Sequence, residues 1–155
     1  MGRLKRLTLP ATVMLVVVAA GSLVTAQQKP YPIFTFDHFV AAMKTVGQAF
    51  GAVNAALAKN DFEDSKAYLA ISRDRLATTI TFWRDRKKDD AIRFLRDSMT
   101  KMDDLDAALS ANTIDPTAVN AIAKQVGATC QACHAVYREQ DPATKAYRLK
   151  PGSAQ

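Results

Sequence analysis

The stretch Cys130-Gln131-Ala132-Cys133-His134 lies near the end of a 155-residue chain and organises the rest of the sequence around it. A Cys-x-x-Cys-His run is the attachment motif for c-type haem, in which two thiols form thioethers with the vinyl groups and the histidine binds the iron. On a helix, at about 100° per residue, the two cysteines and the histidine share one face and can meet one planar group. The motif therefore predicts one covalent haem c, with Cys130 and Cys133 as its links and His134 as the proximal iron ligand.

Two other kinds of site use a Cys-x-x-Cys pair. A structural zinc ion needs four ligands, yet His38 is the only other histidine and the sequence has no third cysteine. A thioredoxin-like redox dithiol belongs to a βαβ unit. The sequence shows no strand-like alternation of useful length, which disfavours such a unit. Haem attachment is the interpretation that uses Cys130, Cys133 and His134 together.

The N-terminus has the organisation of a removable secretory signal, predicted at residues 1–26. Three basic residues precede an apolar stretch at 7–24, and Val24-Thr25-Ala26 leads to the cut. The stretch is close to the lower limit for a membrane-spanning helix, so an uncleaved anchor is the alternative. In both cases the globular part is exported, which predicts a periplasmic protein. Removal of the signal leaves 18 of the 21 basic residues against 15 acidic ones, a net charge of +3, so we do not infer nucleic-acid binding.

Four amphipathic helices are predicted between residues 35 and 138, after an extended lead-in at 27–34 and before an irregular tail at 139–155. In each helix the apolar residues recur at steps of three or four. The predicted spans are 35–57, 62–86, 89–109 and 116–138. Four such helices with short connections most simply form an all-α, antiparallel up-down-up-down four-helix bundle.

The ends of these helices carry capping and turn signals. Asn60 suits a left-handed helix end, and Pro116 suits a first helical position. On the first helix, Gly47 and Gly51 lie beside the apolar stripe, where they would allow a neighbouring helix to approach closely. The predicted caps are Thr35 or Asp37, Asp61 and Asp115.

An antiparallel bundle brings the end of the fourth helix, which carries the motif, next to the start of the first. Met43 lies about 10 Å into the first helix, level with the motif, whereas Met99 and Met102 lie deeper in the bundle. His38 points away from the face of Met43. Met43 is therefore the candidate distal iron ligand, with a flexible core side chain as the alternative. Trp83, at the same end, is a candidate for packing on the haem or for the general core.

The chain resembles the class II c-type cytochromes, the cytochrome c′ superfamily, over about residues 36–138. The run CQACHAVYR, at 130–138, is similar to that family's C-x-x-C-H-x-x-aromatic-basic ending. The run MKTVG, at 43–47, resembles the context of the axial methionine in the low-spin branch. The resemblance implies a haem ligated by His134 and Met43, and a haem contact for Arg138, whose alternative is an ordinary helix C-terminal arginine. One departure is the connection before residue 89, which is short and charged where many members have a longer proline-rich loop.

These observations favour an electron carrier rather than an enzyme. The alternative implied by the family is a five-coordinate cytochrome c′ that binds nitric oxide or carbon monoxide, and a thiol oxidoreductase without haem is a third class. The basic run at 84–88 would lie at the haem end and could attract an acidic redox partner. Tyr68 and Ile71 lie off the apolar face of the second helix, as expected for packing on another helix or in a homodimer. Membrane association is expected only if the N-terminal segment is retained.

Overall fold

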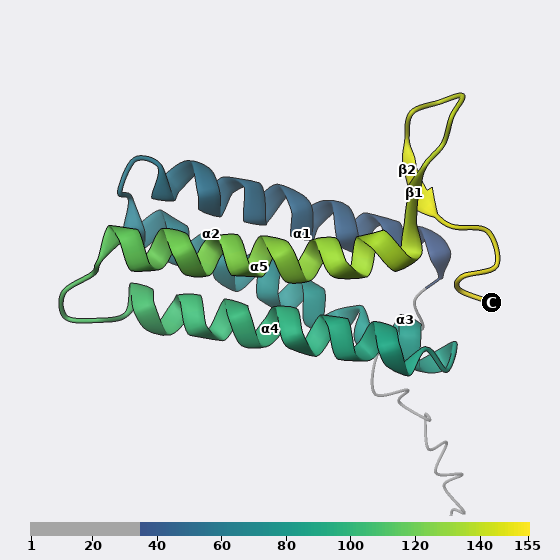
Figure 1. The fold of residues 1–155 in the computed structure, drawn as a ribbon, viewed down its shortest axis with the longest axis horizontal. Helices are drawn as coiled ribbons and strands as arrows, with labels where there is room; N and C mark the ends of the chain where they lie inside the picture. Colours follow the sequence, from purple (N-terminus) through teal and green to yellow (C-terminus); the bar gives the residue numbers. More distant parts are fainter. Residues whose placement is uncertain (1–34) are drawn as a thin grey trace, which may run out of the picture.

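The computed structural model describes residues 35–155 (Figure 1), so the predicted signal at 1–26 and lead-in at 27–34 lie outside the described residues. Its elements, in chain order, are α1 (Phe36–Leu57), α2 (Phe62–Thr78), α3 (Ile80–Asp85), α4 (Asp89–Leu109), α5 (Pro116–Tyr137), β1 (Arg138–Gln140) and β2 (Tyr147–Leu149). The four long helices pack in pairs and form a helical bundle, as the sequence predicts. No helix in the described part of the chain is long and apolar enough to span a bilayer.

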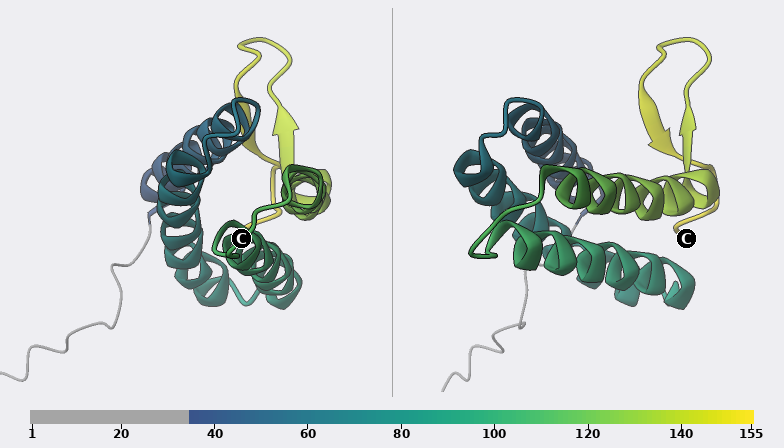
Figure 2. Two further views of the ribbon diagram at one scale, coloured as in Figure 1. Left: turned by 90° about the vertical axis from the view of Figure 1, so that its left-hand side faces the viewer. Right: turned by 60° about the vertical axis from the view of Figure 1, so that its left-hand side comes forward.

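The bundle consists of two helix pairs. Helix α1 packs along α2, and α4 packs along α5. The pairs meet mainly where α2 contacts α4, whereas α1 and α5 approach each other at few positions. The end-on view in Figure 2 shows this arrangement. Consecutive long helices run in opposite directions, so the start of α1, the short α3, the start of α4 and the end of α5 gather at one end of the bundle (Figure 1).

Small buried side chains at seven-residue spacing let α1 and α2 approach closely. On α1 these are Ala42, Ala49 and Ala56, and on and just after α2 they are Ser65, Ser72 and Thr79. The closeness is direct at one point, where the Ser72 hydroxyl donates to the backbone carbonyl of Val46 over 3.3 Å. The large apolar residues alone do not predict this stripe of small residues. Its seven-residue period is nevertheless present in the sequence.

The prediction that Gly47 and Gly51 allow close approach is wrong. Both glycines are exposed, and a Cβ added at either position would meet nothing within 4 Å beyond its chain neighbours and the backbone of its own helix. The alanines provide the small surface instead, because they lie on the side of α1 that faces the core.

The second predicted helix, 62–86, is interrupted at Thr79. Backbone amides near the break bond to carbonyls three residues earlier, from Thr79 to Leu76 and from Phe82 to Thr79. The hydroxyls of Thr78, Thr79 and Thr81 also bond to carbonyls three residues earlier. Threonine hydroxyls that bind nearby backbone carbonyls compete with regular helix geometry, and β-branched residues further weaken the helix. The result is a separate α3 after α2.

The predicted irregular tail contains a small antiparallel hairpin, so that prediction is also wrong in part. Strands β1 and β2 pair Glu139 with Arg148, and the Arg148 guanidinium donates to the Glu139 carboxylate over 2.8 Å. The Asp141 carboxylate accepts from the backbone amides of Ala143 and Thr144 and holds the turn. Three-residue strands are too short to show an alternating pattern, which is why the sequence did not predict them.

The predicted caps and turns are confirmed. The Thr35 hydroxyl accepts from the amide of His38, so Thr35 rather than Asp37 caps α1. The carboxylates of Asp61 and Asp115 accept amides in the first turns of α2 and α5. Asn60 has a φ of 55°, the left-handed conformation expected after α1.

Candidate functional site

The two cysteines lie on the core-facing stripe of α5. Val119, Ala123 and Val126 are buried, and the same stripe continues at steps of three and four into Cys130, Cys133 and Tyr137. Both cysteines are partly buried and pack against the hydrophobic core. His134 follows directly and is also half-buried. The predicted clustering of the three motif residues on one side of the helix therefore agrees with their burial.

The residues that follow α5 hold its last turn. The amide of Arg138 donates to the carbonyl of His134. Lys150, after the hairpin, donates from its backbone amide to Tyr137 over 2.9 Å and from Nζ to Ala135 over 2.7 Å. A lysine at this position satisfies carbonyls that a helix C-terminus leaves without partners and complements the helix dipole. The C-terminal tail thus completes the segment that carries the motif.

Both thiols are free and electrically neutral at ordinary pH. Burial raises the pKa of Cys130, and burial, followed by the charges of Cys130 and Asp90, raises the pKa of Cys133 to about 11. A redox-active dithiol needs a thiol pKa lowered toward or below neutrality. The electrostatics of the pair therefore disfavour the thiol oxidoreductase interpretation.

His134 has a ring nitrogen that lacks a partner. Its Nδ1 is buried and makes no hydrogen bond. Burial, with a smaller contribution from the charge of Arg138, lowers the pKa of His134 to about 4, so the imidazole is neutral near pH 7. A buried polar atom without a partner is unfavourable by about 1–3 kcal/mol. The neutral ring is also the form that binds metals.

The donor set fits a covalently attached haem. Two protonated thiols on an apolar stripe are suited to thioether formation with a large apolar group, and the adjacent neutral imidazole is suited to iron. Within residues 35–155, no three His, Cys, Asp or Glu side chains gather in a way that would hold a metal ion by themselves. Nothing in the described chain therefore supplies the further ligands that a structural zinc site at Cys130 and Cys133 would need.

Met43 lies in the first third of α1, the helix that starts at the end of the bundle where α5 finishes (Figure 1). It is half-buried and packs against the core, between the buried side chains of Phe39 and Val46. On α4, Met102 is fully buried and Met99 is partly buried. The depth and partial burial of Met43 are compatible with both predicted roles, as an iron ligand and as a core side chain.

Trp83 belongs to an aromatic cluster at this end of the bundle. Its side chain is only 1% exposed, and its ring centroid lies 4.6 Å from that of Tyr137. Phe39 and Phe82 complete the cluster and stack on each other with centroids 4.1 Å apart. Trp83 thus lies in the core in direct contact with the helix that carries the motif, a position compatible with both of its predicted roles.

Arg138 follows α5 and belongs to β1. Its guanidinium lies 4.1 Å from the centroid of the Tyr147 ring, a cation–π contact across the hairpin. Its charge also contributes to the lowered pKa of His134. Arg138 is thus both close to the motif and engaged in the hairpin.

Other predicted residues are exposed. Tyr68 and Ile71 on α2 are 37% and 50% exposed, so neither is enclosed by the other helices of residues 35–155. His38 is exposed on α1. The sequence did not predict two contacts near the site. These are the hydrogen bond between Tyr137 and Asp90 and the contact of Ser98 with Cys130. Asp90 and Ser98 are distant in the sequence from the residues that they contact, so no local pattern relates them.

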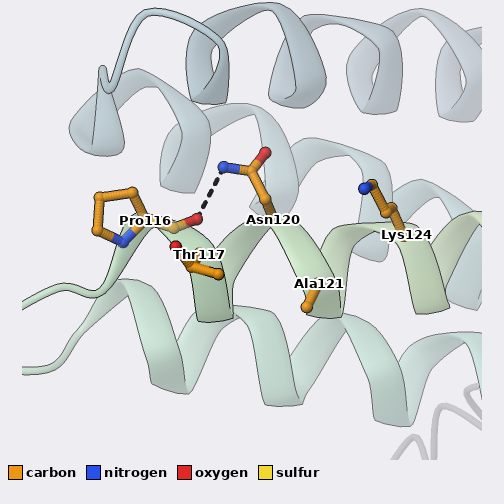
Figure 3. A pocket seen from close by; sticks show the side chains of 5 residues that line it. All are labelled: Pro116, Thr117, Asn120, Ala121 and Lys124. Carbon is orange, nitrogen blue, oxygen red and sulfur yellow. Dashed lines mark hydrogen bonds between the residues drawn. The ribbon is translucent and has the colours of Figure 1, made fainter.

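Two surface hollows lie outside the motif. The first, of about 410 Å³, is at the start of α5 (Figure 3). His134 lies in the last turn of the same helix. There Asn120 donates to the backbone carbonyl of Pro116 over 2.7 Å. The second, of about 400 Å³, lies between the start of α1 and β2. Neither is lined by the motif residues.

Comparison of the chain with models of known protein families, with curated proteins and with solved structures finds no match.

Proposed function

We propose that the chain is an exported, periplasmic monohaem c-type cytochrome that transfers single electrons. The observation that carries the proposal is the chemistry of the end of α5. Two half-buried neutral thiols lie there beside an imidazole with a buried, unpartnered nitrogen. That donor set matches the Cys-x-x-Cys-His motif in residue type, spacing and protonation state.

Each residue has a distinct part in this proposal. Cys130 and Cys133 hold the haem through thioether bonds, and His134 offers a neutral imidazole to the iron. The attached haem supplies a one-electron iron couple. The packing of α5 on α4, together with Lys150 at its end, keeps these three side chains in fixed positions. The basic residues at 84–88 lie at the same end of the bundle, where they would attract an acidic partner protein.

Met43 is proposed as the distal iron ligand. Its support is its half-buried position in the first part of α1, on the helix that faces α5 across the less tightly packed side of the bundle. A methionine thioether bound there would leave the iron no open position and would raise its reduction potential. Without that ligand the same site would have an open position, the arrangement of the gas-binding alternative.

The first experiment tests haem attachment. The full chain is produced with its export segment in a host that carries out haem c attachment, and the purified protein is examined by its alkaline pyridine spectrum after acid–acetone extraction. Covalent haem should remain in the wild type and be lost from the Cys130→Ser/Cys133→Ser variant. Absence of bound haem in the wild type contradicts the proposal.

The ferric spectrum then distinguishes the two functions. A low-spin spectrum with a sulfur-to-iron charge-transfer band supports electron transfer, and Met43→Leu should abolish that band. Met99→Leu is the matched control, because it replaces another partly buried methionine on the opposite helix pair. A high-spin wild-type spectrum, or a band that survives in Met43→Leu, would favour nitric oxide or carbon monoxide binding.

A further inference from the structure

A hydrogen bond joins the last residue of α5 to the first turn of α4. The Tyr137 hydroxyl donates to Oδ1 of Asp90 over 2.6 Å. Tyr137 lies three residues after His134 and four after Cys133, so these side chains are neighbours on the helix surface. The bond therefore brings a carboxylate from another helix to the edge of the proposed attachment site.

The surroundings of Tyr137 fix this carboxylate in place. The Tyr137 side chain is only 5% exposed and packs on Trp83, which is itself enclosed by Phe39 and Phe82. A buried tyrosine hydroxyl needs a polar partner, and Asp90 is that partner. Because the ring has little room to move, the position of its acceptor is fixed as well.

The carboxylate remains ionised and its charge reaches the motif. The hydrogen bond from Tyr137 is the largest cause that lowers the pKa of Asp90. Asp90 is also close enough to Cys133 for its charge to act on that side chain. Two cations lie nearby, since Arg93 acts on Asp90 and Arg138 acts on His134. The motif is thus flanked by charges of opposite sign from two different elements.

We propose that Asp90 is a fixed negative charge beside the haem site that lowers the reduction potential of the bound iron, and that Tyr137 is the residue that positions it. The inference rests on the proposed function and extends it to how the potential is set. A nearby negative charge stabilises the oxidised iron relative to the reduced iron. Its effect grows as the distance between the charge and the iron shrinks.

The test compares the reduction potentials of Asp90→Asn, Asp89→Asn and the wild type, all with covalent haem. Asparagine keeps the size of Asp90 and an oxygen that can accept from Tyr137, so mainly the charge is removed. The equilibrium constant for reduction should rise about three- to tenfold, or about 30–60 mV at 59 mV per tenfold for one electron. Asp89 is the matched control, since it is exposed in the same first turn of α4. Removal of its charge should change the equilibrium constant for reduction by less than about twofold.

Tyr137→Phe tests the positioning. The phenyl ring keeps the core packing but removes the hydrogen bond that holds Asp90 beside α5, so the potential should rise by less than in Asp90→Asn. Because Tyr137 acts only through Asp90, the double variant should have the potential of Asp90→Asn alone. If the shift in reduction potential of the double variant equals the sum of the two single shifts, the positioning role of Tyr137 is overturned. Urea unfolding of each variant verifies that the fold is retained.

The experiment distinguishes failure of this inference from failure of the proposed function. Normal haem content with equal potentials in Asp90→Asn and Asp89→Asn would overturn this inference and leave the proposed function standing. A wild-type protein without covalent haem would overturn both.

Discussion

Arg73 on α2 and Asp103 on α4 form a two-pronged ion pair across the contact between the helix pairs. Nη2 of Arg73 lies 2.9 Å from Oδ2 of Asp103, and Nε donates to the other carboxylate oxygen. Lys66 and Asp106 repeat this connection further along the same two helices, with an N–O distance of 3.6 Å. Asp103 and Asp106 are therefore largely exposed and also bind the neighbouring helix.

The Arg73–Asp103 pair should contribute modestly to stability. Both side chains are substantially exposed, so water and salt weaken their attraction, and a coupling energy of about 0.2–1 kcal/mol is expected. A double-mutant cycle with Arg73→Met and Asp103→Asn, followed by urea unfolding, measures it. The coupling should fall when the salt concentration is raised to about 1 M. Lys101 and Asp104, paired within α4, are the control for a contact that joins no helices. A zero coupling at low salt would contradict the prediction.

Replacement of Gly51 by Ala should stabilise the protein. A methyl group there would meet nothing within 4 Å beyond its chain neighbours and the backbone of its own helix, so the substitution introduces no clash and gains about 0.5–1 kcal/mol of helix propensity. The contrast is Ala49, buried against α2, where Ala49→Val should destabilise by about 1–3 kcal/mol through overpacking. Thermal or urea unfolding measures both changes. A loss of stability in Gly51→Ala would mean that this face of α1 is covered in solution.

The thiols of the haem-free folded protein should react slowly with iodoacetamide. With a pKa of about 11, Cys133 is only about one-thousandth thiolate at pH 8, whereas a free cysteine is about a quarter thiolate. Alkylation followed by mass spectrometry should therefore be far faster in 8 M urea than in buffer. Because the folded pKa is raised, the stability that this group contributes should decline as the pH rises from about 9 to 11. Equal alkylation rates with and without urea would refute the predicted burial.

The haem-free protein should lose stability as the pH falls from 6.5 toward 4. The pKa of His134 is lowered from 6.5 to about 4 in the folded chain, so acid charges this ring more readily in the unfolded chain. The contribution of His134 is therefore complete above pH 6.5 and declines below it. Urea midpoints between pH 5 and 6.5 isolate this effect, because most carboxylates titrate lower. His134→Gln should flatten the dependence in this range, and an unchanged slope would assign it to another group.

Local signals in the sequence were sufficient for most of the fold. The recurrence of apolar residues at steps of three or four predicted the four long helices, and Asp115 predicted where α5 begins. These features depend on residues a few positions apart, whose geometry follows from the helix repeat.

The features that the sequence did not predict depend on distant contacts or on weak local preferences. Asp90 and Tyr137 are 47 residues apart, so no local pattern relates them. The break at Thr79 follows from competition between hydrogen bonds of the threonine hydroxyl and regular helix geometry. The local sequence favours neither outcome strongly. The burial of the unpartnered Nδ1 of His134 depends on the packing around α5, which no local pattern predicts.

The arrangement of the helices in pairs has a mechanical consequence. The pairs are joined mainly along α2 and α4, and the opposite side, between α1 and α5, has few contacts. A rotation of one pair about the α2–α4 line would therefore open the molecule on the side of α1 and α5 while each pair kept its internal packing. The bundle can then be regarded as a hinge with α2 and α4 at its axis. Met43 lies on one side of this hinge and His134 on the other, and Trp83 joins the two sides at the motif end of the bundle through its contacts with Phe39 and Tyr137.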